Sequence, residues 1–299
     1  MNDESRINRG RLLACGFWLI ASLALFWKPC LALFRFSLAN DYASHTVLIP
    51  FISAGLIYVE RRRIFSRVSF DYRLAALFCA ICAVVSFWTV RAASNWTQSG
   101  VLAGYVLALM FFWLAGFACI FGKEALKNGS FPLLFLFLTV PLPGFLLDRV
   151  VYLLQTGSTD VTAVIFHLLR VPAVREGFVF YFGGFTIEVA RECSGIRSSL
   201  ALLILTLLAG HLLLHTFWRQ TVFVVAGVVI MVVKNGIRIA TLSILAAYVD
   251  PRFLTGDLHH KGGIVFFLLG LGFLWPVYWL LVRSEDGAME FPSLPSQHL

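Results

Sequence analysis

Charged residues are scarce in this chain of 299 residues. Asp, Glu, Lys and Arg make up 13% of it, whereas soluble domains contain about 25%. Apolar residues reach 59%, and the mean hydropathy is +0.83. This composition excludes an ordinary soluble domain and predicts a polytopic membrane protein. The net charge of +8 is spread over short connecting segments, which is typical of topology control by Lys and Arg rather than of nucleic-acid binding.

A membrane-spanning helix needs about 20 mostly apolar residues. The chain has eight candidate spans: Leu12–Leu33, Thr46–Glu60, Leu74–Val90, Gly100–Phe121, Phe131–Leu147, Ser198–Phe217, Thr221–Tyr248 and Gly263–Val282. The second is short, and the prolines of the fifth predict a tilted or broken helix. The predicted fold is therefore an all-α polytopic membrane protein with about eight transmembrane helices. We expect one membrane domain over residues 1–283 and a disordered cytoplasmic tail over residues 284–299.

The distribution of basic residues predicts the orientation of the spans. With the N-terminus in the cytoplasm, most short basic connections lie inside, and an even number of spans returns the C-terminus there. The long segment Asp148–Arg197 and the stretch Asp250–Gly262 then lie on the outer face. Within the long segment, Val150–Leu169 predicts an amphipathic helix at the interface. Two aromatic-rich runs around Gly183-Gly184 predict a small β-hairpin.

Cysteine is rare outside the apolar segments. Five of the six cysteines lie within or beside predicted spans, where Cys usually packs as a small hydrophobe: Cys15, Cys30, Cys79, Cys82 and Cys119. Cys193 lies in a polar junction, after the predicted hairpin and before the apolar run Ser198–Phe217. A helix start and the nearby Arg191 and Arg197 favour a thiolate, so Cys193 is a candidate nucleophile. The alternative is packing at a span entry. A thiol-disulfide enzyme would need a second outward cysteine, which the chain lacks.

Arg238 is a cation inside an apolar segment. It belongs to the run Lys234-Asn235-Gly236-Ile237-Arg238-Ile239. A cation in the centre of a span costs about 3 kcal/mol or more, so it normally faces a protein interior or a wet cavity. Lys234 and Asn235 share its helix face. The alternative is that these side chains snorkel from a membrane edge, which suits Lys234 better than Arg238. We expect Arg238 to bind an oxyanion formed when a thiolate attacks a carbonyl.

The pair His259 and His260 precedes the last predicted span. Histidine can protonate a leaving amine and later deprotonate an attacking nucleophile. A histidine pair also suggests a metal, but the chain has no H-E-x-x-H motif and no second matched ligand pair. We therefore expect neither a metal nor another cofactor.

Three motifs, in this order, resemble those of the exosortase/archaeosortase family: Cys193-Ser194-Gly195-Ile196-Arg197, Asn235-Gly236-Ile237-Arg238-Ile239 and His259-His260-Lys261-Gly262-Gly263. The resemblance implies a multi-span cysteine protease and transpeptidase of a prokaryotic cytoplasmic (inner) membrane. Its substrates would be exported proteins with a PEP-CTERM-type sorting signal, which is a short motif, a membrane span and a basic tail.

The resemblance also implies roles for individual residues. Cys193 would be the nucleophile, Arg238 the transition-state stabiliser and His259 the general acid/base, with His260 as the runner-up. Arg197 and Asn235 are predicted to support the site. A function of a different class stays open. In a transporter or polysaccharide-export component, broken spans with buried Lys and Arg would form an anion path, and transport would survive the loss of Cys193.

The predicted orientation can be tested by labelling intact cells with an impermeant maleimide. Cys193 should react, because it is predicted to lie outside the membrane beside groups that favour a thiolate. The Cys193→Ala variant is the control and should lose the label. Labelling that requires permeabilised cells would contradict the predicted topology.

Overall fold

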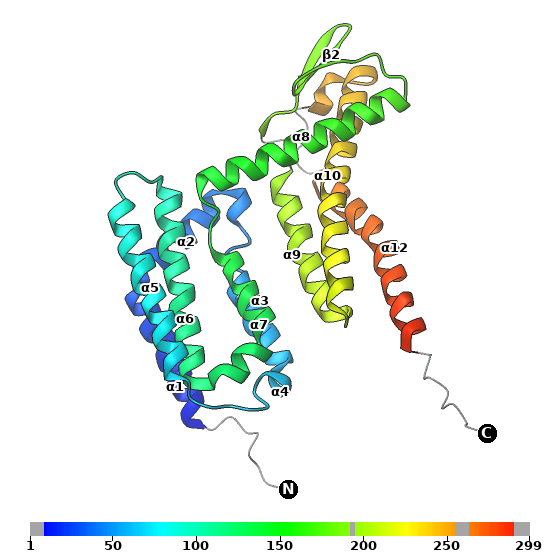
Figure 1. Ribbon diagram of the computed structural model, residues 1–299. Helices are drawn as coiled ribbons and strands as arrows, with labels where there is room; N and C mark the ends of the chain where they lie inside the picture. Colours follow the sequence, from blue (N-terminus) through cyan, green and yellow to red (C-terminus); the bar gives the residue numbers. More distant parts are fainter. Residues whose placement is uncertain (1–8, 192–194, 255–262, 290–299) are drawn as a thin grey trace, which may run out of the picture. The chain divides into compact units, whose positions relative to one another are not determined.

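The computed structural model describes residues 9–191, 195–254 and 263–289. The chain divides into two compact units, Met1–Leu147 and Asp148–Leu299. Helices dominate both units, and a small sheet belongs to the second (Figure 1).

The first unit is a helical bundle built on α6. Its elements are α1 (Arg9–Leu25), α2 (Trp27–Ala39), η1 (Asp41–Ala43), α3 (Ile49–Val59), α4 (Arg61–Ile64), α5 (Tyr72–Ala92), α6 (Gln98–Asn128), α7 (Ser130–Phe135) and η2 (Leu136–Thr139). Small residues let neighbouring helices approach α6 closely, with Gly104 against Thr89 of α5 and Gly116 against Trp18 of α1. The Trp18 indole N–H donates to the carbonyl of Phe112 at 3.0 Å, which joins α1 to α6.

The first predicted span is broken. α1 and α2 meet at an angle of 77°, whereas the sequence predicted one continuous helix over Leu12–Leu33. Pro29 accounts for the break, because it has no N–H to donate to the carbonyl of Leu25, where α1 ends. A cavity of about 980 Å³ lies beside the bend and is lined by residues of α2, α5 and α6.

The second unit combines helices with the sheet. Its elements are α8 (Gly144–Leu168), which starts in the last residues of the first unit, β1 (Val174–Glu176), β2 (Val179–Phe182), β3 (Phe185–Glu188), α9 (Ile196–Leu213), α10 (Phe217–Tyr248), η4 (Pro251–Leu254) and α12 (Gly263–Met289). α9, α10 and α12 lie side by side. α9 and α12 begin, and α10 ends, on the side of the unit that carries the sheet (Figure 1).

The sheet is antiparallel in the order β1-β2-β3. Phe182 pairs with Phe185 across Gly183-Gly184, so the predicted hairpin is confirmed. The sequence did not predict β1, which joins β2 through a turn at Gly177 with φ +60°. Phe180 of β2 is buried with Phe166 of α8 and Ile239 of α10. The sheet therefore packs against α10, the helix that carries Arg238.

The all-α polytopic fold is confirmed, with differences in individual spans. Among the described residues, five helices are long and apolar enough to cross a membrane: α5, α6, α9, α10 and α12. The count rises to seven if the two bent pairs, α1 with α2 and Ser130–Thr139 with α8, are each one span. The second predicted span corresponds to α3, which has only 11 residues. α12 continues to Met289, past Ser284, where a disordered tail was predicted.

α8 carries a stripe of uncharged polar residues on its inner side. Gln155, Ser158, Thr159 and Thr162 are buried, while apolar side chains are exposed: Tyr152, Leu153, Val164 and Leu168. The predicted amphipathic helix is present, but its polar stripe contacts protein. Polar residues of membrane helices normally face the interior in this way.

The packing of α8 on α10 depends on Gly157. A Cβ at this position would lie 2.8 Å from Val232 Cγ1, closer than carbon atoms approach, and a β-branched side chain cannot easily rotate away. Gly157→Ala should therefore lower the apparent unfolding midpoint in detergent, because overpacking costs about 1–3 kcal/mol. Gly272→Ala in α12 is the matched control, since its Cβ would meet nothing within 4 Å. Equal midpoints for the two variants would contradict this packing.

Candidate functional site

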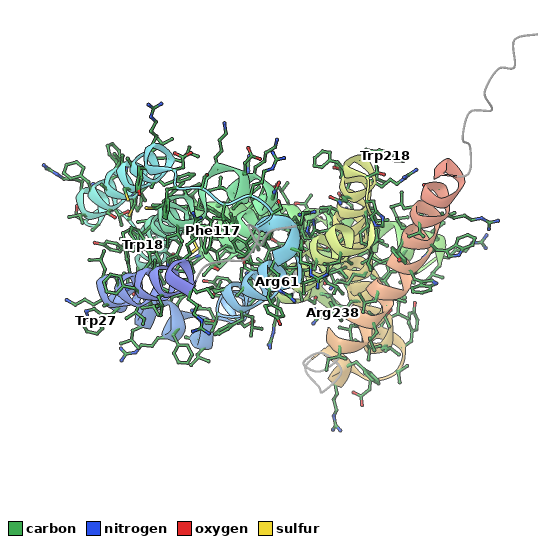
Figure 2. All side chains as sticks on the ribbon, turned by 90° about the horizontal axis from the view of Figure 1, so that it is seen from below. Trp18, Trp27, Arg61, Phe117, Trp218 and Arg238 are labelled. Carbon is green, nitrogen blue, oxygen red and sulfur yellow. The ribbon has the colours of Figure 1, made fainter. Side chains whose placement is uncertain are left out.

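Arg238 is carried by α10 (Figure 2) and is partly buried. Lys234 and Asn235 precede it by one helical turn, and both side chains are 1% exposed. Gly236 lets α8 approach this turn, because a Cβ there would lie 2.5 Å from Val161 Cγ1. Thr162 Oγ1 also donates to the Gly236 carbonyl at 3.2 Å. The predicted Arg238 motif therefore lies inside the second unit.

Asn235 contacts the segment that follows Cys193. Its Nδ2 donates to Ser158 Oγ of α8 at 2.9 Å. Gly195 caps the start of α9 with φ +65°, and a Cβ there would lie 2.4 Å from Asn235 Oδ1. Two motifs that are about 40 residues apart in the sequence thus meet at a contact that only glycine allows.

Lys234 reaches the same segment. Its Nζ donates to Ser198 Oγ in the first turn of α9, and Ser198 Oγ donates to the Gly195 carbonyl at 3.0 Å. The ion pairs found within the described residues do not include Lys234. Because Lys234 is buried, the interpretation that it snorkels from a membrane edge is wrong.

The chain before Cys193 is also held in place, by hydrogen bonds of Val189. Val189 is 1% exposed. Its carbonyl accepts from Gln155 Nε2 of α8 at 2.5 Å, and its N–H donates to the Phe178 carbonyl at 2.9 Å. The backbone is therefore bonded to α8 before the Cys193 segment and contacts α10 after it.

The predicted site residues fall into two groups. Cys193, His259 and His260 lie outside the described residues. Asn235 and Arg238 lie one turn apart on α10, as predicted, whereas Arg197 is exposed on the first turn of α9. Arg191 is exposed and forms an ion pair with Asp148, so its charge already has a partner.

The elements that flank the Cys193 and His259 segments lie at one end of the second unit. The start of α9 follows the Cys193 segment, and η4 and the start of α12 flank the His259 segment. All three elements lie on the side of the unit where α10 ends (Figure 1). Residues 9–191, 195–254 and 263–289 contain no group of three or more His, Cys, Asp or Glu that could hold a metal ion.

Sequence reasoning missed several buried or partly buried polar partners of the site. They are Gln155 and Ser158 on α8 and Ser198 on α9. A signal for the α8 pair existed: Gln155, Ser158 and Thr162 recur every three or four residues and so share one helix face. The helix was predicted to lie at the membrane interface, but Ser158 and Thr162 of this stripe bond α10, and Gln155 bonds Val189.

The contact between Gly195 and Asn235 can be tested with a pair of glycine variants. Ala in the left-handed region costs about 1–2 kcal/mol, so Gly195→Ala and Gly177→Ala share this strain. Gly195→Ala should lower the apparent unfolding midpoint further, because only its Cβ meets a neighbour, Asn235, whereas nothing lies within 4 Å of a Cβ at Gly177. Midpoints that fall equally would show that Asn235 does not limit the space there.

Comparison with protein families supports the resemblance of the motifs. The family model described as transmembrane exosortase matches residues 37–276, which include α10 and the segments of Cys193 and His259. A search of curated proteins and a search of solved structures found no match. The match covers most of the chain and contains all three motifs, so the protein belongs to the transmembrane exosortase family.

Proposed function

We propose that this exosortase is a cysteine protease and transpeptidase that cleaves C-terminal sorting signals of exported proteins. Family membership supports a membrane sorting transpeptidase. The observation that carries the finer assignment is the contact of Gly195 with Asn235. Gly195 follows Cys193 by two residues, and Asn235 precedes Arg238 by one helical turn. Because successive Cα atoms are about 3.8 Å apart, this contact keeps the nucleophile segment near the helix of Arg238.

The local charges favour an anion. α9 has 18 residues, and its N-terminus carries a partial positive charge. Lys234 and Arg238 add two cations on one face of α10, and the ion pairs of the described residues leave Lys234 without a carboxylate. A thiolate at Cys193 and the oxyanion of a tetrahedral intermediate are both anions, and both are stabilised in such a field.

The reaction follows from these roles. The Cys193 thiolate attacks the scissile carbonyl carbon, and the carbonyl π electrons move to an oxyanion that Arg238 binds. The oxyanion collapses, the C–N bond breaks, and His259 gives a proton to the departing amine. A thioester remains on Cys193. Water or an acceptor amine then attacks it, loses a proton to His259, and releases the thiolate.

The proposed substrates are exported proteins with a short motif, a membrane span and a basic tail. The substrate span would place its motif at the depth of the enzyme site, so attack after docking would be effectively intramolecular. The matching location is a prokaryotic inner membrane, with the site on the extracytoplasmic face and both termini in the cytoplasm.

Arg238 can be tested with a charge-conserving change. Arg238→Lys keeps the cation but loses the planar fork of donors, so cleavage of a co-encoded substrate in nanodiscs should fall by about 10²-fold. Arg219→Lys is the matched control on α10, because Arg219 binds Thr216 and the Ser284 carbonyl near the other end of this helix. Wild-type turnover in Arg238→Lys would contradict the oxyanion role.

Cys193→Ala should abolish cleavage while the protein still accumulates in the membrane, because a thioester needs a thiol and the other five cysteines lie within or beside the apolar spans predicted from the sequence. Cleavage of the substrate is followed by the mass of its released N-terminal part. Full cleavage by Cys193→Ala would overturn the nucleophile assignment. Export activity that persists in this variant without cleavage would favour the transporter interpretation.

A further inference from the structure

Lys234 is a buried cation to which the proposed chemistry gives no role beyond the positive charge that it adds to the site. Its side chain is 1% exposed on α10 and ranks among the largest fully buried side chains of the described residues. An ionisable residue inside a membrane helix is costly and normally serves a function. The acceptor bound by Lys234 Nζ is Ser198 Oγ.

This bond ends on the turn that follows Cys193. Ser198 Oγ accepts from Lys234 and donates to the Gly195 carbonyl. Gly195 in turn lies against Asn235, the residue next to Lys234. Two consecutive side chains of α10 therefore hold the same turn of α9, one by direct contact and one through a hydroxyl. Two separate anchors oppose both sliding and rotation of this turn on α10.

We propose that Lys234 and Ser198 are a positioning pair that fixes the start of α9 on α10, and so sets the place of the Cys193 sulfur relative to Arg238. The inference rests on the proposed function. Neither residue touches the substrate in this scheme. Their effect on the rate comes from placement, because a misplacement of about 1 Å can cost about 10²-fold in rate.

The experiment uses the full chain in nanodiscs and two readouts. The first is substrate cleavage. The second is the pH profile of Cys193 alkylation by an impermeant maleimide, which reports the placement and ionisation of the thiol whether or not it is the nucleophile. The variants are Ser198→Ala, Lys234→Met and their combination, with Ser198→Thr to restore the hydroxyl. The matched control is Ser199→Ala, because Ser199 is the next residue of α9, is buried, and its hydroxyl makes no hydrogen bond within the described structure.

Ser198→Ala and Lys234→Met should each slow cleavage by about 10- to 100-fold. Both should move the alkylation profile to higher pH, because the thiol then lies farther from the cations or one cation is gone. The double variant should be no slower than Lys234→Met, since one interaction has been removed twice. Ser198→Thr should keep the wild-type profile, and Ser199→Ala should stay within about twofold of wild type.

The proposal is wrong if Ser198→Ala behaves like Ser199→Ala, or if the effects of Ser198→Ala and Lys234→Met simply add. Ser198→Ala removes one oxygen atom, so it decides the question even if Lys234→Met fails to fold. Failure of the proposed function gives a different result. Cys193→Ala would then still cleave, while the alkylation profiles would still show whether Lys234 and Ser198 place the thiol.

Discussion

The contact of Gly195 with Asn235 is the constraint on which the organisation of the second unit depends. It joins the start of α9 to the middle of α10, and Ser158 of α8 holds the same Asn235 from another side. Leaving a buried polar group without a partner costs about 1–3 kcal/mol. The three helices therefore have one favoured packing in this region, because sliding any of them would break these bonds.

α8 shows how a membrane protein can build a polar interior. Gln155, Ser158, Thr159 and Thr162 are buried against protein, while Leu153, Val164 and Leu168 are exposed. In water, exposed apolar and buried polar side chains would be unfavourable. In lipid, apolar side chains favour the surface of the protein and polar side chains favour its interior. The polar stripe then forms hydrogen bonds at two places near the nucleophile segment: Gln155 donates to the Val189 carbonyl, and Ser158 accepts from Asn235.

The sequence predicts the polar residues of the site better than their partners. Arg238 and Asn235 are conspicuous because they interrupt an apolar run, and the β2–β3 hairpin is marked by its aromatic runs and its glycine pair. Periodicity also identifies the stripe on α8, but it does not reveal whether that stripe faces water or protein. The partner of Lys234 lies 36 residues away, and no local pattern encodes such a contact.

Two local features were not predicted from the sequence: the strand β1 and the break between α1 and α2. β1 is the short strand Val-Arg-Glu, all exposed, so no buried alternating pattern marks it. The break between α1 and α2 was missed because Pro29 acts on a carbonyl four residues earlier, inside what reads as one apolar run.

The most direct test of the account is to trap the covalent intermediate. Enzyme mixed with substrate is quenched in acid, digested and analysed by mass spectrometry. The account predicts that the N-terminal part of the substrate is attached to Cys193 through a bond that hydroxylamine cleaves, as expected of a thioester. Complete cleavage with no adduct on Cys193 at any time point, or an adduct on a different residue, would contradict it.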